Sequence, residues 1–109
     1  MPVGAGTGPI RSLDMSVLNV RGVDLHHDLS GQGPTMIWGH GLTSSRARED
    51  ATGLVDWGRV REHARVLRYD ARGHGESGST ADPGDYHWRA LGHDQLALAD
   101  ARYIGRYVG

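Results

Sequence analysis

The stretch that decides the fold is RYDARGHGESG, residues 68–78. Its first two residues belong to the segment 65–69. The length and the apolar residues of this segment predict a short buried strand that ends at Asp70. From residue 71 to about residue 85 the chain is rich in Gly, Ser and Pro, which predicts a long loop. The pattern therefore places a strand and a glycine-rich loop in sequence.

Two known motifs can be compared with this stretch. Gly73, Gly75 and Gly78 have the G-x-G-x-x-G spacing of a dinucleotide-binding loop, but a pyrophosphate site needs a helix to start at the third glycine, and residues 79–84 continue as loop. Ser77 lies in GESGS, which lacks the second glycine of the G-x-S-x-G nucleophile elbow, and no other serine meets that pattern. We therefore expect neither a nucleotide site nor a nucleophilic serine in this chain.

The segments before this stretch predict a hairpin and then a buried strand. Residues 17–20 and 23–29 flank Arg21-Gly22, and both strands of this hairpin are expected at the periphery, the second with one exposed face. Residues 35–38 are apolar without alternation, which is typical of a central strand covered on both faces.

Helical signals separate the strands and follow the last one. Ser44 or Ser45 can cap a short helix through residues 46–51, and Asp56 can cap a second one. A third helix is expected over residues 86–103, with four residues near one face: Ala90, Leu91, Leu98 and Ala101. Asp94 of this helix is expected to be a partly buried carboxylate that accepts local hydrogen bonds, and residues 104–108 can begin a further strand. The order predicts an α/β fold in which parallel strands with flanking helices follow an antiparallel hairpin.

Composition excludes several classes of protein. The chain has 109 residues, a formal charge of −1 and no cysteine, so we expect at most one domain, no nucleic-acid binding and no cysteine-based metal site. The histidines lack the spacing of a metal site with carboxylates on one face, and no apolar run is long enough to span a membrane. Residues 1–12 predict a flexible N-terminal arm before a domain over residues 13–109. We expect a soluble, cytoplasmic protein.

Two of these segments together resemble a known family. WGHG at residues 38–41, followed about 30 residues later by YDARGHGES at residues 69–77, is similar to the N-terminal part of the α/β-hydrolases. The resemblance spans residues 16–109. It implies a nucleophile, an acid and a histidine, in that order, later in the chain than Gly109. We therefore expect an incomplete α/β-hydrolase domain, truncated before the nucleophile elbow, with none of the three in this chain.

The resemblance assigns one catalytic group to this chain. The backbone N–H of Leu42, the residue after His-Gly, corresponds to one donor of the family's oxyanion hole, and such donors stabilise the charge that develops on a carbonyl oxygen. His40 is expected to shape the loop and not to carry a proton. Asp70, Arg72 and His74 are expected to fix their own loop through hydrogen bonds.

The resemblance also implies the reaction class. We expect hydrolysis of a small carboxylic ester or lactone through a serine acyl-enzyme, with no cofactor and no metal. Leu42 and Thr43 fit the loop patterns of neither the epoxide hydrolases, the haloalkane dehalogenases nor the carbon–carbon bond hydrolases of the family. Two alternatives stay open: an acyltransferase or perhydrolase on the same scaffold, and a non-catalytic module that depends on a partner. The oligomeric state is left open.

Overall fold

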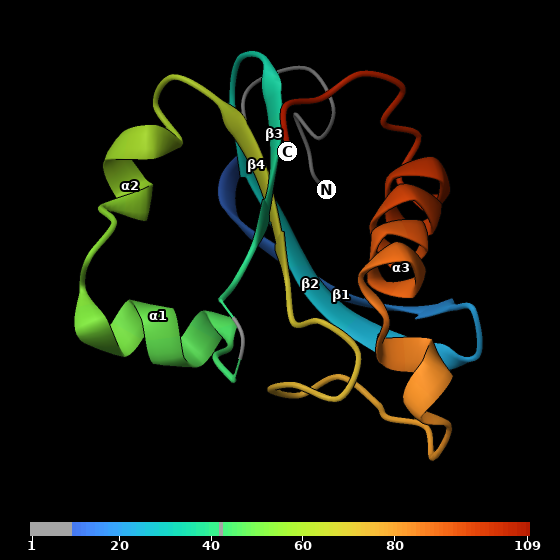
Figure 1. Ribbon diagram of the computed structural model, residues 1–109. Helices are drawn as coiled ribbons and strands as arrows, with labels where there is room; N and C mark the ends of the chain where they lie inside the picture. The colour runs from blue at the N-terminus through green and yellow to red at the C-terminus, as the bar shows by residue number, and fades with distance from the viewer. Residues whose placement is uncertain (1–9, 42) are drawn as a thin grey trace.

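The computed structural model describes residues 10–41 and 43–109 (Figure 1). The strands are β1 (Ile10–Val20), β2 (Val23–Gly31), β3 (Thr35–Gly39) and β4 (Arg65–Tyr69). The helices are α1 (Arg46–Thr52), α2 (Trp57–Val60) and α3 (Trp88–Ala101), with a 3-10 turn at Pro83–Tyr86. The predicted order of elements is therefore confirmed up to α3. Most of the arm expected over residues 1–12 lies outside the described residues, and its last three residues already belong to β1.

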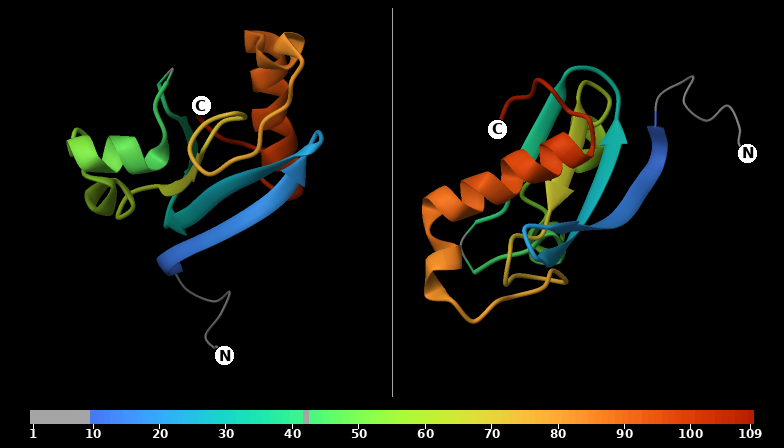
Figure 2. Two further views of the ribbon diagram at one scale, coloured as in Figure 1. Left: turned by 90° about the horizontal axis from the view of Figure 1, so that it is seen from below. Right: turned by 90° about the vertical axis from the view of Figure 1, so that its right-hand side faces the viewer.

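The strands of the described residues form one mixed sheet in the order β1-β2-β4-β3. β2 is antiparallel to both β1 and β4, whereas β3 and β4 are parallel. Helices α1 and α2 lie on one side of the sheet and α3 lies on the other (Figures 1 and 2). This is the predicted α/β arrangement, an antiparallel hairpin followed by parallel strands with helices on both faces.

The hairpin departs from its prediction. The expectation that both of its strands are peripheral is wrong for β2, which lies between β1 and β4. The expectation of an exposed face on β2 holds at Asp24 but fails at Asp28, which is 3% exposed. The reason is Arg46 at the start of α1, which covers the carboxylate of Asp28 and forms an ion pair with it.

The expectation that residues 35–38 form a central strand covered on both faces is wrong for the described sheet. β3 lies at the end of the described sheet, and only Ile37 among its residues is buried. The strand expected over residues 104–108 is reduced to a single parallel bridge between Met36 and Val108. In this bridge the N–H of Ile37 donates to Val108 O at 2.9 Å, and the N–H of Val108 donates to Thr35 O at 3.1 Å.

The helix ends follow the predicted caps. The hydroxyl of Ser45 accepts a hydrogen bond from the N–H of Arg48 at 3.1 Å, and the carboxylate of Asp56 accepts one from the N–H of Arg59 at 3.1 Å. Helix α3 is shorter than expected. Ala101, expected on its apolar face, is exposed, and Ala99 is buried instead.

The two faces of the sheet carry different interiors. The apolar core lies between the sheet and α3, and its buried members include Leu25, Leu29, Leu67, Leu98 and Ile104. The face toward α1 and α2 holds charged and aromatic groups. Trp57, for example, packs edge-on against Trp38 with ring centroids 5.4 Å apart. The face toward α1 and α2 therefore depends on ion pairs and hydrogen bonds as well as on burial.

Candidate functional site

The loops that follow β3 and β4 meet at the carboxyl ends of these two strands. We call residues 40–45 the β3–α1 loop and residues 70–82 the β4 loop. Because β3 and β4 are parallel, their carboxyl ends lie side by side, and ligand sites of α/β proteins occur at such edges. Nε2 of His40 accepts a hydrogen bond from the N–H of Ala71 at 3.0 Å, which joins the two loops directly. The rings of His40 and His74 lie 5.1 Å apart at an angle of 54°.

The contacts of His40 determine its tautomer. Nε2 accepts from an N–H and therefore carries no proton, whereas Nδ1 lies 2.8 Å from Gly41 O and must donate to it. The hydrogen bond from Ala71 therefore requires the tautomer of His40 that carries its proton on Nδ1. Both ring nitrogens contact the backbone, which agrees with the expected role of shaping the loop.

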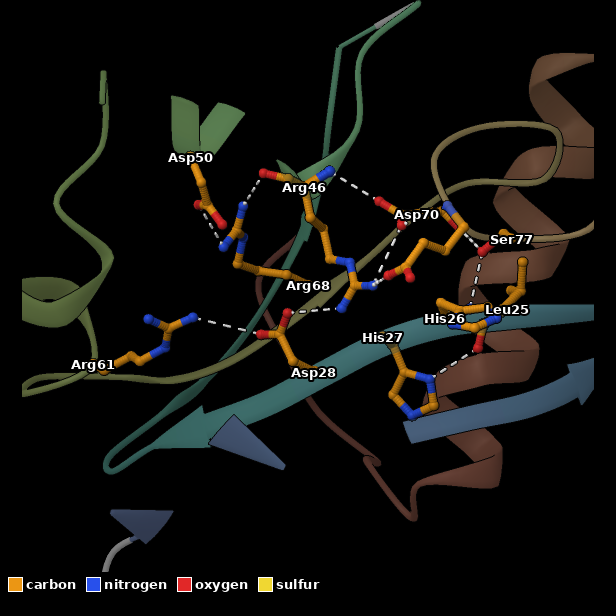
Figure 3. Close-up of polar contacts among 11 residues, drawn as sticks. Leu25, His26, His27, Asp28, Arg46, Asp50, Arg61, Arg68, Asp70 and Ser77 are labelled. Atoms are coloured by element: carbon orange, nitrogen blue, oxygen red, sulfur yellow. Dashed lines mark hydrogen bonds and ion pairs between the residues drawn. The ribbon is translucent and has the colours of Figure 1, made fainter. Parts of the chain in front are cut away.

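Arg46 connects the start of α1 to the β4 loop (Figure 3). Its backbone N–H donates to Asp70 Oδ1 at 2.8 Å, and its guanidinium contacts Asp28 Oδ2 at 2.9 Å and Asp70 Oδ2 at 3.3 Å. Burial by itself raises the pKa of Asp70, but the N–H groups of Arg46 and Glu76 and the Arg46 guanidinium outweigh it and hold the pKa below its ordinary value. Asp70 is therefore a buried carboxylate that stays ionised.

Ser77 stabilises the β4 loop and is not placed as a nucleophile. Its hydroxyl accepts from the N–H of His26 at 2.9 Å and donates to Asp70 O at 2.6 Å. Gly75 in the same loop has φ +52°, and a Cβ there would lie 2.4 Å from Asp70 Cγ. Gly75 thus leaves room for the Asp70 carboxylate, and Ser77 binds the Asp70 carbonyl oxygen.

Arg72 and Asp94 form a second buried ion pair. Nε and Nη2 of Arg72 donate to the two carboxylate oxygens of Asp94, each at 3.0 Å, and Arg21 of the β1–β2 turn adds a contact of 3.0 Å to the same carboxylate. The hydrogen bonds to Asp94 raise the pKa of Arg72. The expectation of local partners for Asp94 is therefore wrong, because its partners lie 22 and 73 residues away in sequence. Arg72 fixes the loop as expected, but through α3.

A largely apolar cavity of about 380 Å³ lies beside these loops. Its lining comes from β3 and its loop, from β4 and its loop, and from α3: Gly39, His40, Gly41, Tyr69, Ala71, His74, Trp88, Leu91, Gly92 and Gln95. Burial raises the pKa of Tyr69, whose hydroxyl accepts a hydrogen bond from Gln95 Nε2 at 3.2 Å. The site combines a cavity with backbone groups of two glycine-containing loops. The part of the chain that the structure describes contains no cluster of three His, Cys, Asp or Glu residues that could hold a metal ion.

Leu42, the one catalytic assignment made from the sequence, lies outside the described residues. Its neighbours are described: the N–H of Ser44 donates to Gly41 O at 3.0 Å, and Thr43 has φ +61°. Sequence reasoning missed Arg46 and Asp28 as parts of this site. Their signal was weak, since Asp28 looked like an ordinary polar position of an alternating strand.

Comparison with solved structures identifies the fold. A hydrolase from Pseudomonas aeruginosa PA01 is 33% identical, with a TM-score of 0.73 over 86% of this chain and 34% of that chain. The enol-lactonase from Burkholderia xenovorans LB400 is 29% identical, with a TM-score of 0.73 over 84% of this chain and 35% of that one. An epoxide hydrolase from Vigna radiata is 23% identical, with a TM-score of 0.70 over 92% and 32% of the respective chains.

These proteins have the α/β-hydrolase fold, and so does this chain, which corresponds to an N-terminal part of it. The chain spans about a third of the length of the solved structures it matches. No family model matches the sequence, and no curated protein does. None of the helices in the described ranges is long and apolar enough to cross a membrane.

Proposed function

We propose that this chain supplies the oxyanion-hole loop of an enzyme that hydrolyses a carboxylic ester or lactone through a serine acyl-enzyme. We use "complete enzyme" for the α/β-hydrolase of which this chain is the N-terminal part. The nucleophile, acid and base lie outside this chain in the proposal, and no cofactor is required. The reaction is acyl transfer to water.

The observation that carries the proposal is the closure of the β3–α1 loop on the β4 loop. His40 Nε2 accepts the N–H of Ala71, and Asp70 Oδ1 accepts the N–H of Arg46. Because its two ends are held in this way beside an apolar cavity, the loop can offer a backbone N–H to a carbonyl oxygen with little reorganisation as charge develops. We assign this donor to the N–H of Leu42.

The neighbouring structures support a hydrolase. The 29% identical neighbour is an enol-lactonase, which agrees with a lactone or ester substrate, whereas the epoxide hydrolase is similar in fold at 23% identity. No second function has an observation in its favour among the described residues.

Product analysis with the complete enzyme tests the proposal. We expect turnover of aryl esters or lactones with water as the acceptor, and no diol formation from an epoxide. Preferential transfer to an added alcohol or to peroxide would instead establish the acyltransferase or perhydrolase alternative. Inactivity toward esters, lactones and epoxides alike would support a non-catalytic, partner-dependent module.

A further inference from the structure

Arg46 joins three segments that are far apart in sequence. It is the first residue of α1, Asp28 lies on β2, and Asp70 follows β4. The guanidinium contacts the carboxylates of Asp28, Asp70 and Glu76 at 2.9, 3.3 and 3.4 Å. The Arg46 side chain is 8% exposed, and Figure 3 shows it directed between Asp28 and Asp70. Arg46 therefore fixes the start of α1 against the sheet and against the β4 loop.

The β3–α1 loop is anchored at both ends by consecutive residues of the β4 loop. At one end, the N–H of Ala71 donates to His40. At the other end, the carboxylate of Asp70 accepts the N–H of Arg46 and also binds its guanidinium. Both ends of the loop are therefore held by two adjacent residues, Asp70 and Ala71.

We propose that Arg46 is a positioning residue for catalysis, because it pins the second end of the β3–α1 loop so that a backbone N–H of this loop keeps a fixed direction. The inference rests on the proposed function, since only a reaction that builds negative charge on an oxygen needs donors fixed in this way. Arg46 is not among the residues that line the apolar cavity. Its effect is indirect, because a displacement of about 1 Å in such a site can lower the rate by about 10²-fold.

The charges around Arg46 show why a neutral residue cannot replace it. Asp28 and Asp70 are buried, and a second cation, Arg61, lies 3.5 Å from Asp28. Burial opposes the charge of Arg46, but the hydrogen bonds and charges of Asp70 and Asp28 outweigh it and raise the pKa of Arg46. Lysine would keep the charge but lacks the planar fork that reaches two carboxylates at once.

Kinetics of the complete enzyme test the proposal. Arg46→Met and Arg46→Lys are compared with Leu98→Ala, which removes a fully buried side chain from the apolar core between the sheet and α3. Each variant is assayed with an aryl ester at a temperature where thermal unfolding shows it fully folded. We expect Arg46→Met to lower kcat by about 10–100-fold with KM changed less than about threefold, and Arg46→Lys to recover part of this loss. Leu98→Ala should keep a kcat near the parental value.

An equal loss of kcat in the Arg46 variants and in Leu98→Ala overturns the proposal, because it would reflect general destabilisation. If Arg46→Met does not fold, the comparison of Arg46→Lys with Leu98→Ala decides in the same way.

Hydrogen exchange separates this inference from the proposed function, because it needs no substrate. In Arg46→Lys we expect the amides of residues 40–46 to exchange at least about tenfold faster and those of α3 to be unchanged. Unchanged exchange in residues 40–46 overturns the positioning role whatever the activity. Faster exchange there in an enzyme that turns over no ester or lactone would leave Arg46 as the anchor of the loop and overturn the proposed function alone.

Discussion

The N–H of Ala71 donates to Nε2 of His40 at 3.0 Å. This hydrogen bond joins the two loops that follow the adjacent parallel strands β3 and β4. His40 can accept this bond only as the neutral tautomer with its proton on Nδ1. This contact defines the geometry of the first part of the β3–α1 loop.

Replacing His40 tests that contact. We expect His40→Ala to lower the free energy of unfolding of the complete enzyme by about 1–2 kcal/mol, because the N–H of Ala71 loses its acceptor in a partly buried site. His40→Gln places an amide oxygen near the same position and should lose less. Urea denaturation of the two variants gives the comparison, and equal stabilities of Ala, Gln and parental proteins would show that the bond contributes nothing.

Gly75 cannot accept a side chain. A Cβ at this position would lie 2.4 Å from Asp70 Cγ, and the backbone has φ +52°. We expect Gly75→Ala to destabilise the protein by about 2–4 kcal/mol. The matched control is Gly92→Ala in α3, where a Cβ meets nothing within 4 Å and alanine should stabilise the helix by about 0.5–1 kcal/mol. Thermal unfolding should shift in opposite directions for the two variants. A shift in the same direction would contradict the tight packing around Asp70.

Asp70 makes stability depend on pH in the acid range. Its pKa in the folded state is lowered, so the unfolded state binds more protons, and stability falls as the pH decreases below about 4. We expect the parental protein to be more stable than Asp70→Asn at pH 6, with a difference that shrinks toward pH 2–3. Denaturation series at several pH values measure this difference, and a value independent of pH would show that Asp70 is not an ionised partner of Arg46.

Local patterns predicted the order of the helices and strands, but not the order of the strands in the sheet or the long-range ion pairs. The caps at Ser45 and Asp56 depend on residues three positions away, so the sequence shows them directly. The burial of Asp28 depends on Arg46, 18 residues later, and an alternating strand carries no sign of that partner. The partners of Asp94 could not be predicted for the same reason, since Arg21 lies 73 residues away. The resemblance of residues 69–77 to a known family, by contrast, indicated the fold that the comparisons show.

The assignment of Leu42 rests on its backbone. Leu42→Ala keeps the N–H, so we expect the kcat of the complete enzyme to change little. Leu42→Pro removes the donor and should lower kcat by about 10²–10³-fold, with a smaller change in KM, because the contact is made mainly in the transition state. Matched thermal transitions must first show that Leu42→Pro is folded, because proline also restricts the loop. A folded Leu42→Pro enzyme with the parental kcat would place the donor elsewhere.

The proposed function requires that this chain provides the oxyanion-hole loop and that another segment provides the nucleophile. The most direct test is covalent labelling of the complete enzyme with a fluorophosphonate, followed by peptide mapping. We predict one labelled serine outside residues 1–109 and loss of ester hydrolysis in step with labelling. Ser77 should stay unlabelled, because both sides of its hydroxyl are engaged by His26 and by Asp70. A label on a serine of residues 1–109, or full ester hydrolysis by an enzyme that cannot be labelled, would contradict the serine acyl-enzyme mechanism and the division of roles proposed for this chain.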